Sequence, residues 1–506
     1  MKLEKLIDAS MVVDQNGEMK TEISNIAYHS GAVGRGFLFC ALPGLVHQGE
    51  QFIQEAVGKK AAAIIGSISP KKLNIKIPYL QVREPRKALA FAATQFFQEP
   101  SRFFNLIGVT GTNGKTTITF LLESILKAAG RHPGVIGTIN YRYKDKVLPS
   151  LHTTPESLDL QKILAEMQQA GVTDVIMEVS SHALMMDRVY GCHFNGGIFT
   201  NLSQDHLDFH KNMEDYFRAK QTLFDNYLVK SEKEKKWCVL NISDSYAKRI
   251  PRNSKIRYLE CSCSERADYW IQKAYCDLSG FDATMETPQG PILLKMALIG
   301  DFNLENCLLS IAAAHSMGLS NEVIIRGLQN FPGVPGRLQR VKAAKNFSVL
   351  IDYAHTPDAL RAVTETLKPL TQGRLIVVFG CGGDRDRTKR PQMGEMASRH
   401  ADVAIVTSDN PRTEEPKQII QDILPGVIKA GLSPYQESAK KGFIVLSDRK
   451  SAIEQALLWA RSQDTVLIAG KGHENYQIIG TKRNHFDDYE IVEDCLRKIK
   501  GTPSCD

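Results

Sequence analysis

Long apolar runs are missing from the sequence. No uninterrupted apolar stretch reaches the roughly 18 residues that a membrane-spanning helix needs. The first residues, MKLEKLIDASMVVDQ, also lack the apolar core of a secretory signal peptide. We therefore expect a cytoplasmic protein without a membrane span.

Paired cysteines and blocks of one charge are scarce as well. The ten cysteines show no repeated CxxC spacing, which argues against a zinc site and favours buried thiols in a reducing compartment. The 63 basic and 56 acidic side chains leave a net charge of +7, and no dense basic block is present. Nucleic acid is therefore not an expected partner, whereas an anionic small-molecule substrate is.

Length and composition indicate several domains. A chain of 506 residues that is 43% hydrophobic and 24% charged is long enough for about three globular domains. The phrase FQEPSR at 97–102 combines proline with polar residues, as a linker does. We expect the domains to span residues 1–104, 105–336 and 337–506.

Apolar runs of strand length alternate with helical patterns along the chain. The expected strands lie at 59–67, 77–83, 103–110, 173–179, 196–202, 237–241, 348–354, 374–380, 402–408 and 465–470. The expected helices begin at residues 85, 115, 357, 391 and 416. This alternation predicts an α/β protein whose second and third domains each contain a mostly parallel sheet covered on both faces. The third domain is expected to be doubly wound.

The most specific single motif is GVTGTNGKTT, from Gly108 to Thr117. It follows an apolar strand and opens a helix, which is the context of a nucleotide-binding P-loop. In such a loop backbone N–H groups surround phosphate oxygens, a lysine neutralises the β- and γ-phosphates, and a hydroxyl ligates Mg²⁺. The strict pattern has glycine where this chain has Val109, so the motif is a variant. The residues expected to bind ATP are Gly111, Thr112, Asn113, Gly114, Lys115, Thr116 and Thr117.

A series of further phrases accompanies the loop. In chain order they are TGTNGKTT (110–117), HTTPESLD (152–159), MEVSSHAL (177–184), FTNLSQDHLDFH (199–210), YFRAKQTLF (216–224), GDFNLENCL (300–308), GRLQRV (336–341), DYAHTPDAL (352–360), FGCGGDRDRTKRP (379–391), SDNPRTEEP (408–416) and AGKGHENY (469–476). Together they resemble the Mur ligase family from about residue 20 to the C-terminus. The resemblance implies a UDP-binding α/β domain, a central ATP-binding P-loop domain and a Rossmann-like domain that binds an amino acid.

The same resemblance implies a magnesium-dependent active site. Lys115, His206 and Lys220 would be catalytic, and the metal ligands would be Thr116, Glu178, His206 and Lys220 as a carbamate, holding two Mg²⁺. Glu178 ends an apolar strand, where α/β sheets bind ligands. Carbamylation requires a neutral amine, so the surroundings of Lys220 must lower its pKa. The alternative for an isolated helix lysine is a side chain that extends along the surface to water.

The substrate contacts are also implied by resemblance. Ser30, Thr153, Thr154, Ser180 and Arg188 would bind a UDP-linked muramoyl dipeptide, although this chain has His29-Ser30-Gly31 where the family often has Asp-Ser-Arg. Further ATP contacts are expected from the set Asn303, Asn306, Asp352 and His355. Taken alone, Arg188 would more simply form a salt bridge, and the two asparagines would cap a helix.

The segment Asp409-Asn410-Pro411-Arg412 bears on which amino acid is used. Meso-diaminopimelate carries a distal carboxylate that L-lysine lacks, and the planar guanidinium of Arg412 suits that carboxylate. Arg385 is a second candidate partner for a carboxylate, Glu474 would receive the distal ammonium, and Gly470 would permit close backbone approach. The alternative is that Arg412 caps a loop through backbone carbonyls.

Taken together, these expectations describe an ATP-dependent amide-forming ligase of peptidoglycan biosynthesis. It would join meso-diaminopimelate to the D-glutamate γ-carboxylate of UDP-N-acetylmuramoyl-L-alanyl-D-glutamate through an acyl phosphate, as a monomer. The alternatives left open are the same ligation with L-lysine and a P-loop ATPase without ligase activity. The segment DNPR and the N-terminal block argue against folylpolyglutamate synthetase, a more distant relative.

Overall fold

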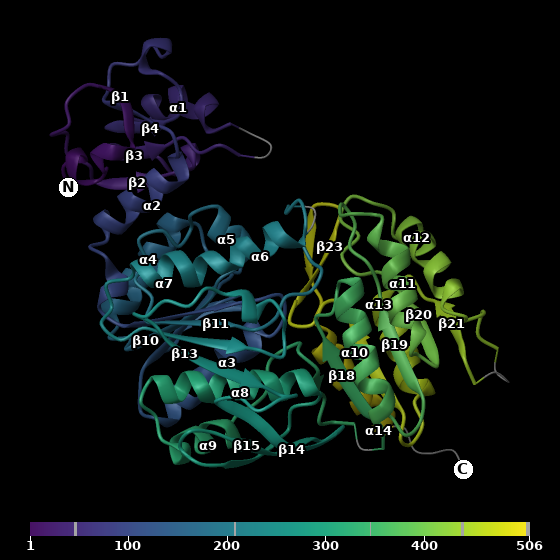
Figure 1. Cartoon of the computed structure of the whole chain (residues 1–506). Helices are drawn as coiled ribbons and strands as arrows, with labels where there is room; N and C mark the ends of the chain where they lie inside the picture. The colour runs from purple at the N-terminus through teal and green to yellow at the C-terminus, as the bar shows by residue number, and fades with distance from the viewer. Residues whose placement is uncertain (45–47, 207–208, 345, 437–439, 502–506) are drawn as a thin grey trace. The chain divides into compact units, whose positions relative to one another are not determined.

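The computed structural model describes residues 1–44, 48–206, 209–344, 346–436 and 440–501 (Figure 1). These residues form two compact units. The first comprises Met1–Ile271, Glu286–Ile292 and Glu305–Asn330, and the second comprises Gln272–Met285, Leu293–Leu304 and Phe331–Asp506. Within the described part of the chain, no helix has the length and apolar character needed to cross a membrane.

The N-terminal part of the first unit is built on a five-stranded sheet in the order β1-β5-β4-β3-β2. Its strands are β1 (Val12–Asn16), β2 (Asn25–Ala27), β3 (Phe37–Cys40), β4 (Ala63–Gly66) and β5 (Tyr79–Val82). Pairing is parallel from β2 to β5, and β1 is antiparallel at the edge. Helices α1 (Ile53–Gly58) and α2 (Pro85–Phe96) accompany the sheet. The alanine-rich face of α2 packs on β3, β4 and β5 in a continuous core.

A second sheet runs through the first unit in the order β14-β13-β12-β11-β6-β10-β7-β8-β9, and β14 contributes only residues 269–271 to this unit. Its strands are β6 (Asn105–Thr110), β7 (Pro133–Ile136), β8 (Asn140–Tyr143), β9 (Lys146–Pro149), β10 (Asp174–Glu178), β11 (Gly196–Phe199), β12 (Trp237–Asn241), β13 (Arg257–Ser262) and β14 (Tyr269–Asp277). Within this order, neighbouring strands pair in parallel from β14 across to β7. Strands β8 and β9 add an antiparallel edge beside β7.

Helices cover this second sheet. They are α3 (Lys115–Ala128), α4 (Ser157–Gln169), α5 (Ser181–Met185), α6 (Met213–Thr222), the π-helical turn η7 (Leu223–Tyr227), α7 (Leu228–Lys230) and α9 (Asn321–Gln329). Helix α9 packs closely on α3, where Gly327 meets the backbone of Ile125 and its carbonyl accepts a hydrogen bond from Ser124. Helix α8 (Asp301–Ser316) runs from the second unit into the first.

The main sheet of the second unit has the order β17-β18-β22-β19-β20-β21. Its strands are β17 (Gln339–Arg340), β18 (Ser348–Asp352), β19 (Leu375–Phe379), β20 (Val403–Val406), β21 (Gly442–Val445) and β22 (Thr465–Ala469). All pair in parallel except the short edge strand β17. Strands β15 (Gly280–Glu286) and β16 (Ile292–Met296) precede this sheet in the chain.

Both faces of this sheet are covered. Helices α10 (Pro357–Leu370), α11 (Lys389–Arg399) and α12 (Pro416–Lys429) pack on one face, and α13 (Arg449–Trp459) and α14 (Asp488–Gly501) on the other. Successive side chains of a strand point to opposite faces, so Val377 of β19 joins the first core and Val378 the second. An uninterrupted apolar strand such as LIVVF is therefore buried on both sides.

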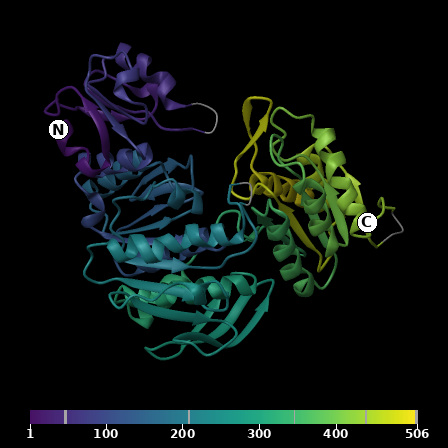
Figure 2. The same ribbon diagram turned by 45° about the horizontal axis from the view of Figure 1, so that its top comes forward.

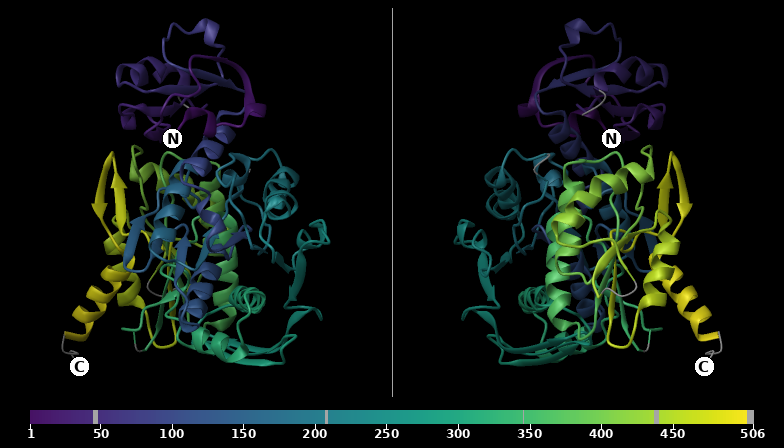
Figure 3. Two further views of the ribbon diagram at one scale, coloured as in Figure 1. Left: turned by 90° about the vertical axis from the view of Figure 1, so that its left-hand side faces the viewer. Right: turned by 90° about the vertical axis from the view of Figure 1, so that its right-hand side faces the viewer.

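Short elements complete the fold. The strands β23 (Tyr476–Ile479) and β24 (Lys482–His485) form an antiparallel hairpin, drawn in yellow in Figure 2. The hairpin and α14 lie toward opposite ends of the second unit in Figure 3. Single 3-10 turns occur at Leu3–Lys5, Ala9–Met11, Ser30–Ala32, Gly49–Phe52, Pro70–Lys72, Pro100–Arg102 and Ala247–Arg249.

The predicted α/β fold class is confirmed, and each expected strand contains an observed one. One helix start differs, because α11 begins at Lys389 and Pro391 is its third residue. Proline fits there, since the first N–H groups of a helix have no partner within the helix. In both units loops that follow parallel strands carry several of the predicted site residues, as expected for an α/β fold, whereas Lys220 lies in α6 and Asn303 and Asn306 lie in α8.

Candidate active site

The loop between β6 and α3 has the strand–turn–helix geometry of a phosphate-binding loop. Strand β6 ends at Thr110 and α3 starts at Lys115. Gly114 has a φ of +86°, and a side chain there would collide with Asn306, so the sharp turn requires glycine. The Lys115 ammonium donates to the carbonyl of Gly111 at 3.0 Å and of Thr112 at 2.8 Å. The dipole at the N-terminus of α3 and the charge of Lys115 thus both contribute positive potential at the phosphate-binding loop.

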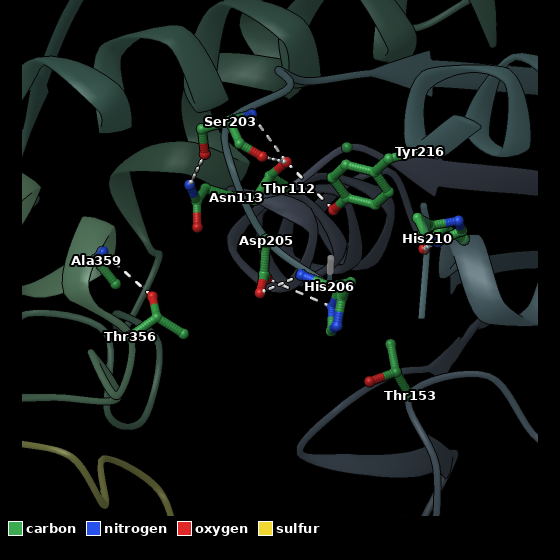
Figure 4. A network of polar contacts seen from close by, with 12 residues as sticks. Thr112, Asn113, Thr153, Ser203, Asp205, His206, His210, Tyr216, Thr356 and Ala359 are labelled. Atoms are coloured by element: carbon green, nitrogen blue, oxygen red, sulfur yellow. Dashed lines mark hydrogen bonds and ion pairs between the residues drawn. The ribbon is translucent and has the colours of Figure 1, made fainter. Parts of the chain in front are cut away.

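The segment after β11 fixes the shape of this loop. The Thr112 N–H donates to the Asn201 carbonyl at 2.8 Å, and the Asn113 N–H donates to the Asn201 side chain at 2.9 Å. The hydroxyl of Thr200 donates to the Asn113 carbonyl at 2.6 Å. In Figure 4 the Thr112 side chain lies between Ser203 and Tyr216, and its hydroxyl is 3.3 Å from the tyrosine hydroxyl. These hydrogen bonds therefore fix the conformation of the loop on the side that faces the segment after β11.

Lys220, on helix α6, contacts the same loop. Its Nζ donates to the Gly111 carbonyl at 2.7 Å and lies 4.5 Å from the centre of the Tyr216 ring. The side chain is buried rather than extended to water. Burial, reinforced by the charge of Lys115, lowers the pKa of Lys220 well below its ordinary value. The neutral amine, the form that can attack carbon dioxide, is thereby favoured.

Glu178 occupies the carboxyl end of β10 and is almost fully buried. Its two oxygens accept from the Thr138 N–H and the Thr138 hydroxyl, both at 2.9 Å. The same hydroxyl is 3.0 Å from the hydroxyl of Thr153. One predicted metal ligand and one predicted substrate contact are thus joined through a residue that the motifs did not indicate.

His206 lies in the segment after β11 with a left-handed backbone, φ +54°. Its Nε2 is 3.4 Å from Asp205 (Figure 4), and its ring is edge-on to His182 with centroids 4.9 Å apart. Burial, with smaller contributions from His182 and Lys115, lowers the pKa of His206 to about 4. The imidazole is therefore neutral at pH 7 and retains a lone pair for a metal ion.

The donors around the phosphate loop fit magnesium in part. Hydroxyl and carboxylate oxygens are the ligands that Mg²⁺ prefers, and Thr116 and Glu178 supply them. An amine does not ligate Mg²⁺, so Lys220 joins this set only as a carbamate. Among the described residues, no group of three or more His, Cys, Asp or Glu side chains gathers closely enough to hold a metal. Substrate phosphates and water complete such shells in many nucleotide enzymes.

The predicted dipeptide contacts lie beside β10. The Thr154 hydroxyl donates to the Glu178 carbonyl at 2.8 Å, and Ser180 caps α5. Arg188 donates to the Thr154 carbonyl at 3.0 Å, and its Nε lies 3.6 Å from Glu156. This is the salt bridge left open as an alternative for Arg188, but a guanidinium has five donors and can take a further anion.

Ser30 belongs to a 3-10 turn in the N-terminal sheet region, and its carbonyl accepts from Lys59 at 2.9 Å. One ion pair and one hydrogen bond link that region to the start of α4: Arg86 pairs with Glu156 at 2.8 Å, and the Tyr28 hydroxyl donates to Asp159 at 2.5 Å. Glu156 therefore connects Arg188 to the N-terminal sheet region within the first unit.

The remaining ATP candidates divide between the two units. Asn306 belongs to the first unit, beside Gly114, whereas Asn303 belongs to the second, where it donates to the Ile299 carbonyl at 2.9 Å. Asp352 is buried and accepts from the N–H groups of Leu338 and Ala354; burial raises its pKa. His355 lies 2.8 Å from the Tyr353 carbonyl.

The loop after β20 carries the predicted amino-acid contacts. Arg412 has a φ of +52°, and its guanidinium donates to the Gly383 carbonyl at 2.7 Å. This is the loop-capping contact left open as an alternative, and it leaves further guanidinium donors for a carboxylate. The backbone of Arg412 is paired with the hairpin through Ile478 and Gly480, which fixes the direction of its side chain.

The loop after β22 brings Gly470 and Glu474 to the same place. Gly470 has a φ of +114°, and a side chain there would meet the carboxylate of Asp409. Glu474 accepts from the Asn410 amide at 2.9 Å. Arg385, in the loop after β19, is exposed. The structure thus brings Asp409, Asn410, Gly470 and Glu474 together, with Pro411 and Arg412 continuing the same loop.

Several residues near these positions were not predicted. Thr138, Asn201, Glu156 and Tyr216 lie in the first unit, and Lys471 and Gln477 in the second. Asn201, Tyr216 and Lys471 stand inside motif phrases, so their position could have raised attention. Thr138 had no such signal, because its contact with Glu178 depends on how two distant strands pair.

The fold and the phosphate loop define a nucleotide-dependent α/β enzyme of the P-loop class. The sequence matches the model of the Mur ligase middle domain at residues 109–314 and that of the Mur ligase, glutamate ligase domain at residues 336–472. The chain belongs to the Mur ligase family.

Relatives match over nearly the whole chain. The chain is 41% identical to the UDP-N-acetylmuramoyl-L-alanyl-D-glutamate--2,6-diaminopimelate ligase of Geobacter metallireducens, over 99% of each chain. It is 42% identical to ligase 1 of the same name from Clostridium acetobutylicum, over 99% of this chain and all of that one. A solved structure of a ligase of that name aligns with a TM-score of 0.70 at 31% identity, covering 99% of this chain and 100% of that one. MurF ligase from Thermotoga maritima in complex with ADP shares the fold, with a TM-score of 0.61 at 20% identity, over 94% of this chain and 97% of that one.

Proposed function

We infer that this chain is an ATP-dependent ligase of peptidoglycan biosynthesis. It adds meso-diaminopimelate to the D-glutamate γ-carboxylate of UDP-N-acetylmuramoyl-L-alanyl-D-glutamate. Full-length identity of 41% to ligases that carry this name supports the inference. The single structural observation that supports the choice of amino acid is the joining of the Arg412 loop to Glu474 through Asn410.

Arg412 and Glu474 are proposed to recognise the distal end of diaminopimelate. Arg412 offers a planar guanidinium to the distal carboxylate, and Glu474 offers a carboxylate to the distal ammonium. Arg385 is proposed as a second cation for a substrate carboxylate, and Gly470 permits close approach of the backbone. A site built for this zwitterionic end disfavours L-lysine. Lysine has no distal carboxylate, so it would leave Arg412 without its partner.

The proposed reaction has two steps. The γ-phosphoryl group of ATP passes to the glutamate γ-carboxylate and gives an acyl phosphate. The amine of diaminopimelate attacks that carbonyl, and phosphate leaves. Lys115 and the N-terminus of α3 stabilise the negative charge that moves between the oxygens. Positional isotope exchange in ATP that depends on the UDP-dipeptide would support the intermediate, and its absence during turnover would contradict it.

Magnesium ions are proposed to accompany ATP, with Thr116, Glu178, His206 and carbamylated Lys220 as protein ligands for two of them. When bound, such ions offset the repulsion between the phosphates and the carboxylate. The protein's own contribution is a neutral imidazole, a carboxylate held in one orientation by Thr138, and a lysine whose pKa is lowered by burial.

Carbamylation of Lys220 has its own test. The neutral amine attacks the carbon of carbon dioxide and the nitrogen releases a proton to solvent, which leaves a carbamate anion with two oxygens. We expect Lys220→Ala to lose ligation and to regain part of it when a short carboxylic acid is added. A variant that stays fully active without any acid would contradict the assignment. Lys230→Ala, three residues beyond the π-helical turn, is the matched control.

The remaining contacts are proposed by the same family relationship. The domains are proposed to span residues 1–104, 105–336 and 337–506. The UDP-dipeptide would contact Ser30, Thr153, Thr154, Ser180 and Arg188, and ATP would also contact Asn303, Asn306, Asp352 and His355. We propose that the enzyme acts in the cytoplasm as a monomer, since ATP and a nucleotide-linked precursor are its substrates.

The decisive experiment uses the purified full-length chain. It is given ATP, Mg²⁺ and the UDP-dipeptide with either meso-diaminopimelate or L-lysine, and the product is identified by mass spectrometry. The tripeptide with diaminopimelate is expected. A product with lysine alone would replace the proposed substrate. Phosphate release that needs neither the dipeptide nor an amine would instead indicate a P-loop ATPase.

A further inference from the structure

Lys471 is a buried cation next to the proposed amino-acid site. Its side chain is completely buried, and its ammonium lies 3.3 Å from the Asn410 amide oxygen and 3.3 Å from Glu474 Oε2. The Tyr476 ring is 5.4 Å away. Burying an ammonium without a compensating charge or hydrogen bonds is strongly unfavourable. A lysine in this place therefore requires the carboxylate beside it.

Asn410 has one possible orientation in this network. Its amide oxygen accepts from the Ile478 N–H at 2.9 Å as well as from Lys471. Its amide nitrogen is thereby directed at Glu474 Oε2, to which it donates at 2.9 Å. Since an N–H of Ile478 can only donate, the reverse orientation of the amide would place two donors against each other. Asn410, Lys471 and Glu474 form a closed triangle.

The triangle joins the two halves of the proposed amino-acid site. Asn410 stands two residues before Arg412, and the hairpin strand that orients Asn410 also pairs with Arg412. Gln477 of the same strand donates to the Asp409 carbonyl at 2.7 Å. Glu474 is the third corner. Both donors of the triangle engage the same glutamate oxygen, Oε2, which fixes the position of that oxygen.

We propose that Lys471 is a positioning residue that orients the Glu474 carboxylate toward the ammonium of the amino-acid substrate. The proposal rests on the function proposed above. Lys471 neither reacts nor contacts the reacting atoms. It holds the glutamate in one orientation, and through Asn410 it couples that orientation to the loop that carries Arg412.

Steady-state kinetics of Lys471→Met test this role. Loss of a charge-assisted contact is expected to raise the KM for diaminopimelate about 10-fold or more. The KM values for ATP and the UDP-dipeptide should stay within about twofold, because those substrates do not depend on Glu474 in this scheme. Lys471→Arg, which keeps the charge, should recover part of the loss. Lys482→Met on the exposed strand β24 is the matched control and should behave as wild type.

A double variant separates positioning from mere stability. Lys471→Met/Glu474→Gln removes both charges, so no unpaired carboxylate remains buried. Its KM for diaminopimelate should equal that of Glu474→Gln alone, because Lys471 acts through Glu474. Additive effects of the two changes would overturn the proposal, as would a Lys471→Met enzyme whose KM for diaminopimelate is unchanged. If Lys471→Met fails to fold, the double variant and Lys471→Arg give the same decision, and misfolding of both would overturn it.

The failure of this proposal is distinguishable from that of the proposed function. Wild-type enzyme that does not incorporate diaminopimelate contradicts the function, whatever the variants do. Wild-type enzyme that incorporates it, with a Lys471→Met variant that alters only the melting temperature, contradicts the positioning role alone.

Discussion

The phosphate loop of the first unit and the amino-acid site of the second both follow parallel strands, but they manage charge in opposite ways. At the phosphate loop two lysines, Lys115 and Lys220, donate to the same Gly111 carbonyl. In the second unit the buried cations face carboxylates: Lys471 faces Glu474, and Arg449 faces Asp488. At the phosphate loop Lys115 and the N-terminus of α3 supply positive potential, while the pKa of the neighbouring Lys220 is lowered. In the second unit each of these two buried cations is paired with a carboxylate.

The difference matches the chemistry of the proposed ligands. ATP and a carboxylate bring a large negative charge, so a region of excess positive potential gains most when they bind. Diaminopimelate is a zwitterion at each end, and a site for it needs both signs in fixed places. The charges of the two regions are thus consistent with the different ligands proposed for them.

Replacing Lys115 should have the largest effect of the changes that compare the two regions. Lys115→Met is expected to lower kcat for ligation about 10³-fold, because a donor to the transferring phosphoryl group is lost. Product formation with all three substrates measures it. The control Lys127→Met changes an exposed lysine of the same helix and should remain active. Equal activity of both variants would remove Lys115 from the reaction.

Breaking a balanced pair in the second unit should affect stability next. Arg449→Met leaves the fully buried Asp488 carboxylate without its partner, which should lower the free energy of unfolding by about 3–5 kcal/mol. Denaturant unfolding measures the loss. Arg497→Met breaks an exposed pair on α14 and should cost about 0–1 kcal/mol. A similar loss of unfolding free energy in both variants would show that the buried pair contributes no more to stability than the exposed pair.

Replacing Arg412 tests the substrate specificity of the proposed amino-acid site. Arg412→Met should raise the KM for diaminopimelate about 30- to 100-fold, since a charge-assisted contact to the distal carboxylate disappears. The KM for L-lysine should change little, so the preference between the two amino acids narrows. Competition between the two, read by mass spectrometry, measures this. Arg399→Met on the exposed side of α11 is the control. An unchanged preference would leave only the loop-capping role.

The smallest expected effect concerns His473 and pH. Burial, with Arg337 and His355 nearby, lowers the pKa of His473 to about 3, while the unfolded chain has an ordinary value near 6.5. Between those values the unfolded state binds more protons, so this residue makes the protein less stable as pH falls from about 6.5 toward 3. Its contribution to the slope is at most about 1.4 kcal/mol per pH unit.

The measurement compares unfolding curves of wild type and His473→Gln from neutral to acid pH. The variant should have a flatter dependence, and the exposed His132→Gln should leave the wild-type slope unchanged. Identical slopes for wild type and His473→Gln would mean that the buried imidazole is protonated in the folded state.

The sequence was most informative where packing alone determines structure. Strand β12 occupies the predicted residues 237–241, because an apolar run buried on both faces leaves a clear pattern. The hairpin β23–β24 was missed, since Lys482–His485 are exposed and carry no alternation of apolar side chains. Yet this hairpin holds Arg412 in place through backbone pairs that no side-chain pattern records.

The same limit applies to the candidate site. Motifs pointed to Glu178 and Lys220, and both lie at the loop end of the sheet. They did not point to Thr138, whose partner is 40 residues away in the chain. Nor did they point to the role of Lys471, since a lysine between two glycines in a sequence gives no indication of burial. Contacts of that kind depend on the folded topology.

The division into two units has a practical consequence for anyone who wishes to study them separately. The chain passes between the units at residues 271, 285, 292, 304 and 330. Neither unit is therefore a continuous stretch of the gene, and a fragment that starts at residue 331 would lack two segments of its own unit. Limited proteolysis at one of these crossings would nick the protein without releasing either part, and the nicked enzyme would be recovered as a single species until denatured.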